Sequence, residues 1–293
     1  MKIAVITDTH FGHYVGPPGV EMPGGNFCAQ PVWVGGLPVL MRKIDRFLKK
    51  HDANVLVHCG DLIHFNDESA DQELPRGYLK PQALELLNAP SSYDTCFLAL
   101  GNHDLMDPSD GLAKWSTELQ KYPRIVTGDN SKVVDGVQFI VMNNQWLQAD
   151  GTYDYIWEKG TPVAGFDEQQ WSWLAESLAA ESDLPVVLCL HYPSFLPPDS
   201  FAEVKSSPEH DGYVDRLTKT LDSSGRKTLI LTGHVHMTKR VKLGQSTLIS
   251  TAAFSEWPLQ TRLITVKEDK FHIEVFDLID DEEINGTERV VTI

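Results

Sequence analysis

Short apolar runs recur along the chain, and segments with helical periodicity separate them. The runs span residues 2–7, 54–59, 95–100, 185–190 and 228–232. Their length and β-branched content are typical of buried strands. Apolar residues recur at helical spacing in residues 38–49, in a segment after Ser109, and in one that starts near Asp167, a candidate N-cap. Alternating strands and helices favour a largely parallel, buried sheet.

The pattern changes in the second half of the chain. Residues 133–141 form a strand, an Asp135-Gly136 turn and a second strand, a strong hairpin signal, and only strand signals follow residue 236. We therefore expect an α/β fold of two stacked sheets with helices outside, in a single domain over residues 1–293. Segments 12–36 and 144–165 lack periodicity, and long irregular loops are often functional, so both are candidates for covering an active site.

Charge and composition restrict the partners. The chain has 293 residues and a formal net charge of −16, which argues against nucleic acid or an anionic membrane as a partner. A bound metal cluster could reverse the sign locally, so a phosphate substrate stays open. We find no signal peptide or membrane span, and the four cysteines form no C-x-x-C pair, which indicates a cytoplasmic protein with free thiols.

Polar residues of the metal-ligating types follow each of the five apolar runs. They are Asp8-Thr9-His10, Gly60-Asp61, Gly101-Asn102-His103-Asp104, His191 and Gly233-His234-Val235-His236. Each motif alone is weak evidence: Gly60-Asp61 is a common turn, and His191 could simply end a strand. In open α/β sheets, however, ligands bind outside the carboxyl ends of the strands. Five strands that deliver such residues to one edge indicate a functional site.

The chemistry of these residues points to two metal ions. The candidate ligands are Asp8, His10, Asp61, Asn102, His191, His234 and His236. Seven are too many for one tetrahedral ion, and nitrogen and oxygen donors without thiolate suit manganese, iron or zinc. Two ions that share a carboxylate could activate a bridging hydroxide and clamp a phosphoryl group, so the nucleophile would be solvent. A single structural zinc ion is the alternative.

The ordered motifs together resemble the signature of the calcineurin-like metallophosphoesterases, from residue 8 to residue 236. This resemblance implies a four-layer αββα sandwich, with two mixed β-sheets flanked by helices. It also implies that Asp8, His10 and His236 hold one metal, that Asn102, His191 and His234 hold the other, and that Asp61 bridges them. By the same resemblance His103 is a catalytic residue that assists the leaving group, and Asp104 orients its imidazole.

One departure from the family bears on the substrate. Many relatives continue the Gly-Asp motif with an acidic residue and a glycine, whereas this chain continues with Leu62, Ile63 and His64. We therefore expect hydrolysis of a small phosphodiester, such as a cyclic nucleotide. The alternatives are a phosphomonoesterase or protein phosphatase, and a non-catalytic scaffold of the same fold. His13 and His64 are candidate substrate contacts, although either could be a solvated loop residue. The oligomeric state stays open.

Overall fold

The structure is a computed structural model. It describes residues 1–11, 37–63, 79–105, 111–144, 165–180, 183–194, 208–256, 259–278 and 291–292. The irregular segment 12–36 lies outside the described residues, as does all but the two end residues of segment 144–165. That these two segments cover the active site therefore stays a prediction. The single domain over residues 1–293 also stays a prediction.

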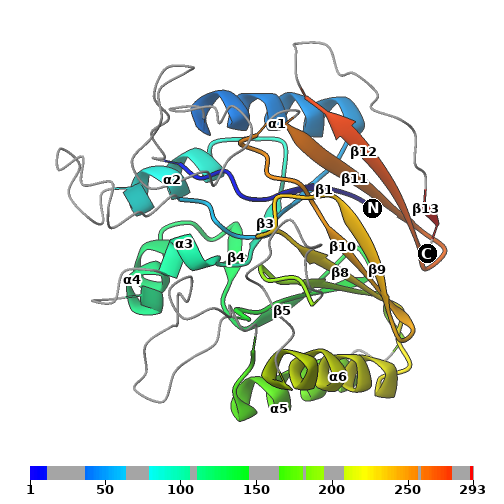
Figure 1. The fold of residues 1–293 in the computed structure, drawn as a ribbon. Coiled ribbons are helices and arrows are strands. Elements are labelled where there is room, and N and C mark those ends of the chain that lie inside the picture. The colour runs from blue at the N-terminus through cyan, green and yellow to red at the C-terminus, as the bar shows by residue number, and fades with distance from the viewer. Residues whose placement is uncertain are drawn as a thin grey trace, which may run out of the picture.

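The first sheet has seven strands and contains the N-terminal strand near its middle (Figure 1). In spatial order the strands are β13 (Val291–Thr292), β12 (Lys270–Asp277), β11 (Gln260–Lys267), β1 (Lys2–Ile6), β2 (Val55–His58), β3 (Thr95–Leu98) and β4 (Ile125–Thr127). Strands β1 to β4 are mutually parallel. Strand β11 pairs antiparallel with β1 and with β12, so the sheet is mixed.

The second sheet has six strands and is also mixed. In spatial order they are β5 (Asn130–Val134), β6 (Val137–Val141), β7 (Val186–Cys189), β8 (Thr228–Thr232), β10 (Ser246–Ser250) and β9 (Lys239–Leu243). The central four are parallel, and the edge strands β5 and β9 are antiparallel to their neighbours. The hairpin predicted at Asp135-Gly136 joins β5 to β6, with positive φ at both turn residues.

Apolar residues alternate along the strands and fill both faces of each sheet. Between the sheets, Val57 and Phe97 of the first sheet belong to the same cluster as Phe139 of the second. The rings of Phe97 and Phe139 stack, with centroids 4.3 Å apart. This inner cluster joins the two sheets into one sandwich.

Helices cover the two outer faces (Figure 1). The first sheet packs against α1 (Leu37–His51), α2 (Leu79–Asn88) and α4 (Gly111–Leu119), and the second sheet against α5 (Glu168–Ala180) and α6 (Pro208–Ser223). The predicted four-layer αββα sandwich is confirmed. Helices α2 and α6 and strand β4 were not predicted, whereas the helix expected from Asp167 is α5. No helix in the described part of the chain combines the length and apolar composition that a bilayer crossing needs.

Candidate metal centre

The seven predicted ligands all follow the carboxyl ends of parallel strands. Asp8 and His10 follow β1, Asp61 follows β2, Asn102 follows β3 and opens the short helix α3 (Asn102–Leu105), His191 follows β7, and His234 and His236 follow β8. The loops after β1 and β2 stay hydrogen-bonded to each other beyond the sheet. The N–H of Asp8 donates to Gly60 O at 2.9 Å, and the N–H of His10 donates to Asp61 O at 3.0 Å. This pairing brings ligands of two strands together.

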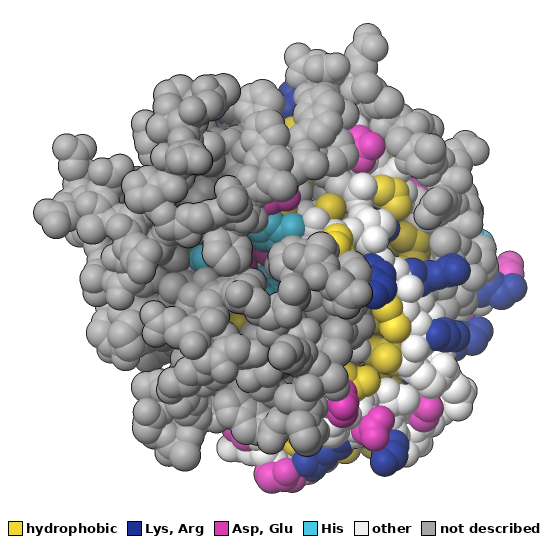
Figure 2. Space-filling model, in the orientation of Figure 1, with side chains coloured by type: hydrophobic (Ala, Val, Ile, Leu, Met, Phe, Trp, Pro, Cys, Tyr) yellow, Lys and Arg dark blue, Asp and Glu magenta, His cyan; other side chains and the backbone are white. Residues whose placement is uncertain are grey.

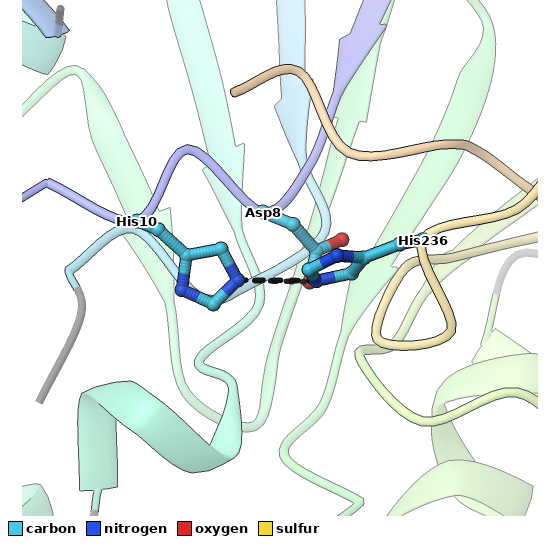
Figure 3. A group of neighbouring side chains, drawn as sticks. All are labelled: Asp8, His10 and His236. Atoms are coloured by element: carbon cyan, nitrogen blue, oxygen red, sulfur yellow. Dashed lines mark hydrogen bonds and ion pairs between the residues drawn. The ribbon is translucent and has the colours of Figure 1, made fainter. Parts of the chain in front are cut away.

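Asp8, His10 and His236 form the first ligand group (Figure 3). The Nε2 atoms of His10 and His236 lie 3.1 Å apart. The Nε2 atom of His236 also lies 3.4 Å from Oδ1 of Asp8. Two ring nitrogens and a carboxylate oxygen that converge in this way suit a divalent cation.

Asn102, His191 and His234 form the second ligand group. The amide oxygen of Asn102 lies 3.0 Å from Nε2 of His191 and 3.0 Å from Nδ1 of His234. Asn102 and His191 are buried, and His234 is half-buried. This group offers two nitrogens and one neutral oxygen.

Asp61 lies between the two groups. Its Oδ2 atom is 3.3 Å from Nε2 of His191 and 3.9 Å from Nε2 of His10. Its Oδ1 atom accepts a hydrogen bond of 2.9 Å from the backbone N–H of His103, which anchors this oxygen away from Oδ2. One oxygen therefore faces both ligand groups, the position that a bridging carboxylate needs.

Hydrogen bonds at the far side of two imidazoles set which ring nitrogen faces the site. Nδ1 of His191 lies 2.7 Å from the carbonyl oxygen of Cys59, which can only accept. Nδ1 of His236 lies 2.6 Å from Oε1 of Glu256. In the neutral rings both Nδ1 atoms then carry the proton, and the Nε2 lone pairs point at the ligand groups.

Opposite charges balance each other inside this buried site. Burial opposes ionisation of Asp61, but the positive charges of His191 and His103 hold the pKa of Asp61 well below its usual range. Burial likewise disfavours a charged His191, but the Asp61 carboxylate raises the pKa of His191 to about 9. Burial and the charge of His191 lower the pKa of His234 to about 3. Cations would therefore compete with a proton on His191.

Five of the predicted ligands have a left-handed backbone, which is uncommon for residues other than glycine. Their φ angles are 51° at Asp8, 44° at His10, 52° at Asp61, 69° at His234 and 49° at His236. Such conformations cost free energy and concentrate at functional sites. The turns at the strand ends adopt these strained conformations, and the five side chains thereby converge at the site.

Two glycines of the motifs are required because side chains of the site pass close to their backbone. A Cβ atom at Gly233 would collide with the side chains of Thr7 and Asp8, and one at Gly101 would collide with the Asp61 carboxylate. The glycine before a ligand therefore makes room for a ligand from another strand.

Comparison with known proteins adds the family to this geometry. The family model described as calcineurin-like phosphoesterase matches residues 1–238, which is most of the chain. The chain belongs to the calcineurin-like phosphoesterase family. No curated protein matches the sequence significantly.

Several solved structures resemble this chain in fold at low sequence identity. A dimetal phosphatase from Danio rerio has a TM-score of 0.65 at 15% identity, over 98% of this chain and 99% of that one. A purple acid phosphatase from yellow lupin has a TM-score of 0.59 at 15% identity, over 97% of this chain and 52% of that one. GAP50, described as the anchor in the inner membrane complex of Plasmodium, has a TM-score of 0.52 at 13% identity, over 100% of this chain and 87% of that one. At these identities the likeness concerns the fold.

His103 lies beside the first ligand group of this calcineurin-like site. Its ring stands edge-on to that of His10, with centroids 4.8 Å apart. Ligand atoms of His10, Asp61 and His103 lie within 4.8 Å of one another, so the imidazole borders the space between the ligand groups. Figure 2 shows histidine side chains reaching the surface on this face. Its assignment as a proton donor, and not a ligand, stays a prediction.

Asp104 is buried beneath the calcineurin-like site and binds backbone N–H groups. Its carboxylate accepts hydrogen bonds from Gly101, Leu62 and Ile63 at 2.8, 3.3 and 3.0 Å. These bonds tie the loop after β2 to the loop after β3, which is a different task from the predicted orientation of His103. The predicted contact with the His103 imidazole stays a prediction. His13 and His64 lie outside the described residues.

Several residues that support the ligands were not predicted as part of the site. Glu256 contacts His236, and Oδ1 of Asn144 accepts hydrogen bonds from the backbone N–H groups of His191 and Tyr192 at 3.2 and 3.1 Å. Asn144 comes three residues after the end of the strand signal at residues 137–141. A search for polar groups after this strand would have found it. Glu256 carries no comparable signal.

His58 is fully buried on β2. Its ring also connects two loops of the site. Nδ1 accepts the N–H of Gly60 at 3.2 Å, which leaves the proton on Nε2, 3.1 Å from the Thr9 hydroxyl. Burial lowers the pKa of His58 to about 4, so the ring is neutral near pH 7.

Proposed function

We propose that this chain is a metal-dependent hydrolase of phosphoric esters and that its substrate is a small phosphodiester, such as a cyclic nucleotide. The observation that carries the proposal is the convergence of seven nitrogen and oxygen ligands from five strand ends, with Oδ2 of Asp61 facing both ligand groups. Membership of the calcineurin-like phosphoesterase family supports the same reaction class.

The residues present fit two metal ions. Asp8, His10 and His236 would hold the first ion, and Asn102, His191 and His234 the second, with Asp61 shared. Imidazole nitrogens with carboxylate and amide oxygens suit manganese, iron or zinc. When bound, the two ions would supply a water of lowered pKa and would clamp the phosphoryl oxygens.

The chain contributes orientation and a proton. Asp61 is fixed by the His103 N–H, and His191 by the Cys59 carbonyl, so the ligands are held in place before substrate binds. The His103 imidazole, next to His10, would donate a proton to the departing oxygen of the ester. The attacking group would be solvent, and no side chain would form a covalent intermediate.

The preference for diesters rests on residues 62–64. Leu62 and Ile63 have apolar, buried side chains, and the N–H groups of both are bound to Asp104, so these two residues offer a phosphate neither a charge nor a free N–H. A phosphomonoesterase on the same ligands is the alternative. We also propose that nucleic acid is not a partner, because the chain carries a net charge of −16.

A pair of chromogenic substrates tests the proposal. We expect the manganese-loaded protein to hydrolyse a bis-aryl phosphate with a higher kcat/KM than the corresponding mono-aryl phosphate. A higher kcat/KM for the monoester would support the phosphomonoesterase. Turnover of neither ester, with two ions bound per chain, would support a non-catalytic scaffold and contradict the proposed hydrolase.

A further inference from the structure

Glu256 places a carboxylate behind one imidazole of the first ligand group. Its Oε1 atom lies 2.6 Å from Nδ1 of His236, and the Glu256 side chain is 11% exposed. Nε2 of the same imidazole faces His10 and Asp8. Glu256 thus contacts the ring nitrogen of His236 that does not face the other ligands of the first group.

The loop after β10 holds Glu256 in this place by contacts to both sheets. The N–H of Thr251 donates to Thr232 O in the second sheet at 3.0 Å. The N–H of Phe254 donates to Thr7 O at 2.8 Å, and the Ser255 hydroxyl donates to Asp8 O at 2.6 Å. Phe254 is fully buried. Ser255, the residue before Glu256, is therefore attached to the backbone of the ligand Asp8, so Glu256 follows an anchored part of the loop.

The second ligand group has no equivalent among its described contacts. The Nδ1 atom of His191 donates to the carbonyl oxygen of Cys59, which is neutral. The oxygen ligand of that group is the amide of Asn102, also neutral. The first group thus has Asp8 as a ligand and Glu256 behind His236, whereas the shared Asp61 is the one carboxylate that the described contacts place against a side chain of the second group.

We propose that Glu256 is a positioning residue for the first metal ion. It holds His236 in the tautomer that presents Nε2, and its charge makes the ring a stronger donor, so it raises the affinity of the first ligand group alone. Partners of this kind behind a metal-binding histidine typically contribute about 10–100-fold in metal affinity. The inference rests on the proposed function, since it requires that the two ligand groups bind two ions.

Metal titrations of the chelator-stripped protein test this role. We expect wild type to bind two Mn²⁺ ions per chain in isothermal titration calorimetry. In Glu256→Gln, which keeps the shape of the side chain and removes its charge, we expect about 10–100-fold weaker binding at one site and unchanged binding at the other. Glu176→Gln, on the exposed face of α5, is the matched control and should titrate as wild type does.

A second measurement follows the tautomer of His236. In the zinc-loaded wild type, nitrogen NMR of the imidazoles should show a protected Nδ1–H on both His236 and His191. In Glu256→Ala, the signal of His236 should be lost and that of His191 should remain. A purely structural role in the loop would lower the urea midpoint without changing this signal. The urea midpoints of all variants are measured alongside.

The outcomes separate this inference from the proposed function. Two ions bound with wild-type affinities in both Glu256 variants would overturn the role of Glu256 and leave the proposed function standing. Equal weakening at both sites would overturn the assignment to the first ligand group. Failure of the wild type to bind two ions would overturn the proposed function and the inference together.

Discussion

At the scale of single residues, the two oxygens of Asp61 have different tasks. Oδ1 accepts the His103 N–H, and Oδ2 faces one imidazole of each ligand group. Asp8, in contrast, contacts His236 of the first group, and its carboxylate accepts the N–H of His234. The two carboxylates should therefore differ in how many ions depend on them.

Substitution of Asp61 tests the shared position. We expect Asp61→Asn to weaken the binding of both ions, because it removes the negative charge between the two ligand groups. Asp8→Asn is the matched comparison and should weaken mainly the binding of the first ion. Metal titration of both variants gives the answer, and wild-type occupancy of both sites in Asp61→Asn would contradict a bridging carboxylate.

Substitution of His103 tests the proton donor. We expect His103→Ala to lower kcat about 10²–10⁴-fold, the usual contribution of a general acid, while two ions stay bound. His272→Ala serves as the control, because it removes a histidine in strand β12, away from the site. Loss of an ion from His103→Ala, measured by elemental analysis, would show that this imidazole is a ligand.

At the scale of elements, polar side chains determine where a helix begins. Helix α5, which carries no ligand, shows this clearly. Oδ1 of Asp167 accepts the N–H of Gln170 at 2.7 Å, and Oε1 of Gln170 accepts the N–H of Asp167 at 3.1 Å. This reciprocal cap begins the helix that buries Trp171 against the second sheet.

Removal of this cap should destabilise the fold by a predictable amount. We expect Asp167→Ala to lower the free energy of unfolding by about 1 kcal/mol, because the N–H of Gln170 loses its acceptor. Urea denaturation with a constant m-value measures the change. Glu176→Ala removes an exposed carboxylate from the same helix, and an equal loss in that variant would show that the cap is not the cause.

At the scale of the whole molecule, each ligand group joins the two sheets. Asp8 and His10 follow β1 of the first sheet and His236 follows β8 of the second, while Asn102 follows β3 and His191 follows β7. An ion in either group would therefore crosslink the two sheets at their carboxyl edge. The inner apolar cluster holds the same sheets together below the site.

Metal binding should accordingly stabilise the whole fold. We expect the melting temperature to rise with added Mn²⁺, since a ligand at 100 times its Kd contributes about 2.7 kcal/mol per site. Chelation should reverse the rise, and Asp61→Asn should show a smaller one. Scanning calorimetry measures the effect, and equal melting temperatures with and without Mn²⁺ would contradict a site that joins the sheets.

The sequence was sufficient for the sandwich and for the position of the seven candidate ligands at one edge of it, while metal binding by them stays a prediction. Buried parallel strands are continuous apolar runs, and their carboxyl ends meet at one edge, so residues that follow the runs converge whatever the loops between them do. This is why Asp61 and His234 could be predicted once all five motifs were considered together, although neither motif was decisive alone. Helices α2 and α6 were missed, although α6 buries Tyr213, Leu217 and Leu221 at helical spacing, so a search for this period would have found α6.

The tertiary structure alone decided which groups support the ligands. Glu256 lies 20 residues beyond His236, and nothing in its neighbours marks it, because its contact depends on how a loop of the second sheet folds over the first. Asp104 binds the loop after β2 because β2 and β3 are neighbours in the first sheet, and the sequence does not show which strands are neighbours. Local sequence patterns indicate whether a residue is buried or lies in a turn. Contacts between loops depend on how the two sheets stack.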